Sequence, residues 1–105
     1  MIEQVFHYSL GDNKSIEKII FDENLNYIHM VFPKGGGAPE HYTNGNVYMT
    51  VLRGVLSIKL GEQEARDYTR GSIIKIPHNT KMLIKNPYEA VLELIIVKAP
   101  APEVK

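Results

Sequence analysis

Short apolar segments rich in valine, isoleucine and tyrosine recur along the chain, separated by glycine, asparagine and proline turns. Segments of this kind between turn residues are typical of β-strands. They predict strands over residues 5–10, 16–21, 25–32, 47–52, 55–60, 65–68, 73–76, 81–85 and 90–97. Residues 16–21 also suit one face of a helical turn, so that segment has an open alternative. The pattern indicates an all-β fold, a sandwich or jelly-roll barrel of about eight to ten strands.

The composition fits a compact domain that needs no covalent cross-links. A chain of 105 residues can bury a core, and the absence of cysteine excludes disulfides and thiolate metal sites. Twelve basic and twelve acidic residues give formal neutrality, and the basic ones are scattered, so nucleic acid is not an expected partner. With no secretory signal and no run of about 20 apolar residues, we expect a cytoplasmic protein with no membrane partner. We expect one domain over residues 1–98 and an extended tail over residues 99–105.

Two stretches, residues 35–54 and 71–86, place glycines, a proline and an asparagine at set offsets. These offsets resemble the two signature motifs of the cupin family of small β-barrels. The positions that match the motifs are Gly35, His41, Gly54, Gly71, Pro77 and Asn86. The resemblance covers about residues 16–98. It implies a double-stranded β-helix, or jelly-roll barrel, and a homodimer that pairs through sheet faces or exchanged N-terminal strands.

The resemblance also shows which metal-binding positions differ from the family pattern. Thr43, Val47 and Met82 stand where cupins usually carry a histidine, a glutamate and a histidine, and Asn79 stands for a glycine. Hydroxyl, alkyl and thioether groups cannot replace imidazole and carboxylate ligands for a divalent cation. His41 is the one remaining ligand position. We therefore expect no metal and no other cofactor.

Two alternative interpretations of the candidate metal-binding positions stay open. A shift of one residue places Glu40 and Tyr42 at the two histidine positions of the first motif, although it loses the spacing from Gly35. An off-pattern metal site drawn from His41, Glu40, His29 and His78 is a further alternative.

The replacements outline a candidate ligand pocket. Strand side chains alternate between faces, so Val47, Met49 and Val51 point inward together, as do Met82 and Ile84. Such side chains either fill a small barrel or line a pocket for a small organic ligand. The candidate ligand-binding residues are His41, Thr43, Val47, Met49, Met82 and Ile84.

Three functions follow as hypotheses. The first is a cupin-type module that binds a small organic ligand without metal. The second is a metal-free isomerase, epimerase or cyclase with His41 as general acid or base and Tyr42 or Tyr48 assisting. The third is a divergent metal-dependent dioxygenase or isomerase. We prefer the binding module, and whether the chain is an enzyme stays open.

Overall fold

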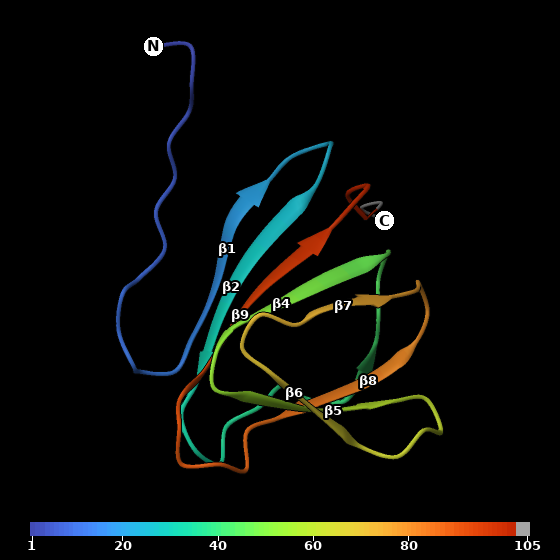
Figure 1. Ribbon diagram of the computed structural model, residues 1–105. Coiled ribbons are helices and arrows are strands. Elements are labelled where there is room, and N and C mark those ends of the chain that lie inside the picture. Colours follow the sequence, from blue (N-terminus) through green and yellow to red (C-terminus); the bar gives the residue numbers. More distant parts are fainter. Residues whose placement is uncertain (103–105) are drawn as a thin grey trace.

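The structure, a computed structural model, describes residues 1–102, and its regular elements are all β-strands. They form a five-stranded antiparallel sheet in the order β1-β2-β9-β4-β7 and a four-stranded one in the order β3-β8-β5-β6 (Figure 1). The strands are β1 (Ser15–Phe21), β2 (Asn26–Phe32), β3 (His41–Tyr42), β4 (Val47–Arg53), β5 (Val55–Leu60), β6 (Arg66–Thr69), β7 (Ile73–Ile76), β8 (Lys81–Lys85) and β9 (Leu92–Lys98). Within residues 1–102, no helix is long and apolar enough to cross a membrane. The all-β prediction is confirmed, and the helical alternative for residues 16–21 is wrong.

The core lies between the two sheets and is built from alternate strand positions. In β4, Val47, Met49 and Val51 are buried, while the residues between them are partly exposed. In β8, Met82 and Ile84 are buried in the same core cluster. The inward orientation expected for these five side chains is confirmed. Their burial against the facing sheet supplies the apolar area that stabilises the barrel.

Two backbone positions explain why the motif spacing matters. Gly54 has a φ of 81°, and a Cβ there would lie 2.3 Å from the carbonyl oxygen of Val91, so only glycine fits. Asn79, at the position where the family pattern has glycine, has a φ of 61°. Asparagine tolerates this left-handed conformation better than most residues, so the turn forms without glycine.

Asn86 joins the end of β2 to the turn between β8 and β9. Its side chain is 1% exposed, and its amide nitrogen donates to the carbonyl oxygens of Phe32 and Ala90 at 2.8 and 2.9 Å. Its side-chain oxygen accepts from the Tyr88 amide at 3.1 Å. Each group of the buried amide is therefore satisfied by backbone. The asparagine of the second motif holds the scaffold together.

The N-terminal arm, residues 1–14, contains no strand, so the strand predicted over residues 5–10 is wrong. The arm belongs to neither sheet before it enters β1 (Figure 1), and it contacts the five-stranded sheet through Tyr8 and Ser9. Alternating apolar residues form a strand only where a neighbour supplies backbone partners, and within one chain this segment has none. Leu10 is 91% exposed and Val5 is 61% exposed. At the other end, the Ala101 amide donates to the Asn24 carbonyl, whereas residues 103–105 of the expected tail lie outside the described residues.

Candidate functional site

A small cavity of about 40 Å³ lies at one end of the barrel, between the two sheets. Apolar side chains dominate its wall, with a few polar groups at the rim. The lining residues are Ile28, Met30, Ala38, His41, Thr43, Val47, Met82, Ile84, Ile96 and Lys98. This volume admits about three water-sized groups. The interior is thus mostly filled by side chains, with room for a methyl or ethyl group.

Five of the six candidate ligand-binding residues line this cavity, and Met49 does not, because it lies fully buried in the core cluster. Their role in binding stays a prediction. Sequence reasoning missed the other five lining residues, Ala38 and four residues on β2 and β9: Ile28, Met30, Ile96 and Lys98. The register of β2 and β9 carries these four to the cavity: Ile28 lies opposite Ile96, and Lys98 opposite Val47. The alternation of β2 gave a signal for Ile28 and Met30, but the position of Lys98 depends on a pairing between distant strands.

His41 stands at the rim in a defined orientation. Its Nδ1 lies 2.8 Å from the carbonyl oxygen of Pro39, which can only accept, so Nδ1 carries the proton. In the neutral ring, Nε2 then holds a lone pair that can accept a proton or a hydrogen bond. The residues expected to assist are placed elsewhere: Tyr42 is 61% exposed, and Tyr48 carries Lys75 over its ring on the outer face of the other sheet.

Thr43 is a structural residue as well as a lining one. Its hydroxyl donates to the Pro77 carbonyl at 2.7 Å and accepts from the Thr80 amide at 2.8 Å. The residue is 3% exposed, and these two bonds fix the turn after β7 to the residue that directly follows β3. The hydroxyl is committed to backbone, which leaves it little capacity for a ligand.

The side chains at the family's metal-binding positions do not fit a divalent cation. Thr43 is held by backbone, Val47 and Met82 offer no oxygen or nitrogen donor, and His41 alone carries one. Among residues 1–102, no three histidine, aspartate or glutamate side chains lie close enough together to hold a metal ion. A single imidazole binds such a cation too weakly to make a site.

The off-pattern residues are not brought together with His41. Glu40 pairs with Lys81 at 3.4 Å and raises the pKa of that ammonium. His78 accepts a hydrogen bond from the Gly45 amide at Nδ1, 2.8 Å away. His29 is fully buried on the outer face of the five-stranded sheet. Each of these three side chains contacts residues other than His41.

His29 organises a polar cluster on that outer face. Its Nδ1 lies 2.8 Å from Glu17 Oε1 and its Nε2 lies 2.6 Å from Glu93 Oε2, while the Tyr8 ring stacks on the imidazole. Hydrogen bonds from Ser9, followed by the one from His29, lower the pKa of Glu17 to about 2. Glu93 also accepts from Arg53 at 2.9 Å. The cluster anchors the arm and faces away from the cavity.

A groove of about 370 Å³ opens next to the cavity and shares Ile28 and Lys98 with it. Its other lining residues are Lys18, Phe21, Asn26, Asn44 and Pro102. Burial lowers the pKa of the Lys98 ammonium, and the charge of nearby Lys18 lowers it further. The groove thus continues the small cavity, and two lysine side chains, Lys18 and Lys98, line it.

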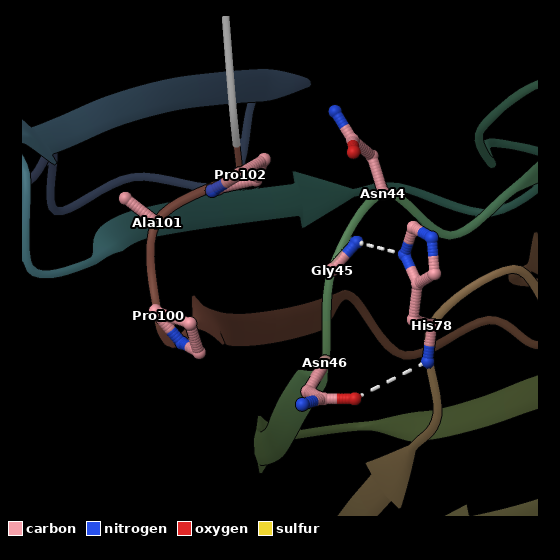
Figure 2. A pocket seen from close by; sticks show the side chains of 7 residues that line it. All are labelled: Asn44, Gly45, Asn46, His78, Pro100, Ala101 and Pro102. Carbon is pink, nitrogen blue, oxygen red and sulfur yellow. Dashed lines mark hydrogen bonds between the residues drawn. The ribbon is translucent and has the colours of Figure 1, made fainter.

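A depression of about 590 Å³ lies between the C-terminal tail and the turns at residues 44–46 and 78 (Figure 2). Pro100, Ala101 and Pro102 form one side of it. On the other side, His78 accepts from the Gly45 amide, and its own backbone amide donates to Asn46 Oδ1 at 3.3 Å. These polar groups are used within the turns, so the depression offers few free groups to a ligand.

No protein-family model matches the chain. The uncharacterized protein MJ0764 of Methanocaldococcus jannaschii is 36% identical over 104 residues, which cover 98% of this chain and 90% of that protein. Its crystal structure, described as an RmlC-like cupin family protein with a double-stranded β-helix fold, superimposes with a TM-score of 0.92 at 37% identity and covers 95% of this chain and 93% of that one. The chain belongs to the cupin family.

More distant structures share the cupin fold alone. An RmlC-like cupin protein from Desulfovibrio desulfuricans has a TM-score of 0.76 at 18% identity, over 96% of this chain and 98% of that one. The TT1209 protein of Thermus thermophilus has a TM-score of 0.77 at 20% identity, over 89% and 91% of the two chains. The predicted double-stranded β-helix is confirmed, and the role of this cupin has to be argued from its own side chains.

Proposed function

We propose that this cupin binds a small organic ligand at the open end of the barrel and does so without a metal ion. The observation that carries the proposal is the cavity beside His41, apolar at its base and polar at its rim. Binding sites for small molecules combine apolar walls with a few placed polar groups. Met30 and Met82 line the cavity, and unbranched thioether side chains adapt their shape to a ligand.

The size of the cavity limits how the ligand binds. At about 40 Å³ it accepts only the end of a molecule, so the rest of the ligand lies over the rim and in the adjoining groove. A ligand of this kind has a short apolar end and a polar remainder. The binding surface then runs from Met82 past Ile28 to Lys98.

A thermal-denaturation screen tests this function. The full chain, produced without an affinity tag and treated with EDTA, is screened against carboxylic acids, amides and alcohols of short carbon chains. We expect at least one class to raise the melting temperature in the presence of EDTA. A protein that responds to none of them, or that responds only after a divalent metal is added, would contradict the proposal.

A second candidate function is metal-independent proton transfer by His41. The contact of its Nδ1 with the Pro39 carbonyl is the observation that favours it, since this contact leaves Nε2 as the acceptor. With a ligand identified from the screen, isomerisation or exchange of its acidic hydrogens is followed by NMR in D₂O. His41→Ala should abolish the exchange, and unchanged exchange in that variant would rule this candidate out.

A further inference from the structure

The groove beside the cavity has an unusual set of polar groups. Lys18 lies opposite Ile28 in the β1–β2 pairing, and Asn26 lies opposite Lys98 in the β2–β9 pairing. The three polar side chains therefore stand on the same concave face, in neighbouring rows of one sheet. Since β1 extends this face beyond the barrel core, they line an open groove rather than a packed interior.

Asn26 supplies an observation independent of the charges. The residue is 5% exposed, and none of the side-chain hydrogen bonds described for residues 1–102 involves its amide. No fully enclosed side-chain nitrogen or oxygen in that range lacks a partner, so the Asn26 amide reaches the groove. In the open groove this amide exchanges hydrogen bonds with water, which a polar group of a ligand can replace. It is available to a ligand in the groove.

The two lysines lack acidic partners in the described part of the chain. Neither Lys18 nor Lys98 forms a salt bridge within residues 1–102, whereas Arg53 and Lys81 each pair with an acidic side chain. Burial and the neighbouring Lys18 both disfavour the charged form of Lys98. Two ammonium groups on one concave face repel each other, and an anion between them relieves that repulsion.

We infer that the groove binds the anionic group of a small organic acid, held by Lys18, Lys98 and the amide of Asn26, with the short apolar end of the acid in the cavity beside Met82. This inference rests on the proposed function and names the class of ligand. The observation that supports this inference is that the cavity and the groove are continuous, because Ile28 and Lys98 line both. A charged oxygen in the groove receives charge-assisted hydrogen bonds, while the methyl end contacts Ile28 and Ile96.

Butyrate is the test ligand, with butyramide as its neutral counterpart and inorganic phosphate as an anion without an apolar end. Binding to the full chain in EDTA is measured by the NMR shifts of methyl-labelled methionines. We expect butyrate to bind about 10-fold or more tightly than butyramide and to move the Met30 and Met82 signals. Butyrate binding should weaken as salt is added, because the groove is open to solvent.

Single substitutions test the contribution of the charged groups to binding separately from that of the cavity. Lys98→Met and the exposed Lys18→Met should each weaken butyrate about 10-fold and leave butyramide within about 2-fold. Asn26→Asp keeps the shape of the side chain and adds a negative charge, so it should abolish butyrate binding. Lys75→Met, on the outer face, is the matched control and should bind butyrate like the unaltered chain.

The outcomes distinguish this inference from the proposed function. If butyrate and butyramide move the Met82 signal with equal affinity, the barrel end binds organic ligands and the anion inference is wrong. If phosphate binds as tightly as butyrate, or butyrate binds without moving Met30 and Met82, the apolar end is not in the cavity and the inference is also wrong. If neither organic compound binds, both the inference and the proposed function lose their support.

Discussion

His29 Nδ1 lies 2.8 Å from Glu17 Oε1, a contact that joins β2 to β1 on the outer face of the five-stranded sheet. The other ring nitrogen faces Glu93 on β9 at 2.6 Å. The imidazole thus lies between two carboxylates and links β1, β2 and β9 on the face opposite the cavity.

We predict that His29→Ala lowers the free energy of unfolding by about 3 kcal/mol, because it removes the hydrogen-bonding partner between two partly buried carboxylates. Urea denaturation measures this change. Lys34→Ala, which breaks an exposed ion pair with Glu89, is the control and should cost less than about 1 kcal/mol. Similar losses in the two variants would show that the His29 cluster does not stabilise the sheet.

Stability should depend on the ionisation of Glu17. Its pKa falls from 4.5 to about 2 in the folded chain, chiefly through the hydrogen bond from Ser9 and then that from His29. A carboxyl whose pKa is lowered by folding stabilises the protein above pH 4.5, and this contribution is lost as the pH falls from 4.5 to 2. Urea denaturation of Glu17→Gln and the unaltered chain should therefore differ most above pH 4.5 and converge towards pH 2. A difference that stays constant through this range would contradict the assignment, and Glu23→Gln controls for loss of an exposed carboxylate.

Gly54 and Gly71 provide a matched pair for the motif glycines. Both have positive φ, at 81° and 91°, but only at Gly54 would a Cβ meet backbone, whereas nothing lies within 4 Å at Gly71. We predict that Gly54→Ala costs about 3 kcal/mol or more and Gly71→Ala about 1 kcal/mol, since the second variant carries the conformational strain alone. Equal losses in denaturant titrations would mean that the close approach to Val91 relaxes freely.

We propose that a second copy of the chain covers the N-terminal arm. Ile2 and Leu10 are more than nine-tenths exposed and Phe6 is about half exposed, and exposed apolar side chains gathered on one segment favour association. Light scattering should give the mass of two chains. A double variant with Ile2→Ser and Phe6→Ser should give the mass of one chain, with Ile73→Ser, an exposed side chain far along the sequence, as its control. A single-chain mass for the unaltered protein would contradict this proposal.

The sequence predicted the scaffold well because local rules govern it. The turn glycines, Pro77 and the alternation in residues 47–51 each act through neighbours along the chain, so the strands from β4 to β9 lie close to their expected positions. Residues 5–10 have the same alternation and form no strand, because pairing needs a partner that this chain does not supply. Alternation is necessary for a strand and does not by itself provide the neighbour.

The candidate site was predicted only in part, for a physical reason. His41 and Met82 came from the motif offsets, and both line the cavity. Lys98 and Asn26 come together through the register between β2 and β9, whose residues are far apart in sequence. Polar residues such as these are common at strand ends, so neither residue stood out in the sequence as a candidate. Only the paired sheet shows that they share a concave face with Lys18.

The methionine methyl groups provide the most direct test of ligand binding at the barrel end. The chain has four methionines: Met30 and Met82 line the cavity, Met49 is buried in the core, and Met1 is exposed in the arm. The methyl-labelled full chain is titrated in EDTA with the compound that gives the largest rise in melting temperature. We predict saturable shifts of the Met30 and Met82 signals, while Met49 and Met1 stay in place. Shifts confined to Met1, or no shift with any compound, would contradict a ligand site at the open end of this cupin barrel.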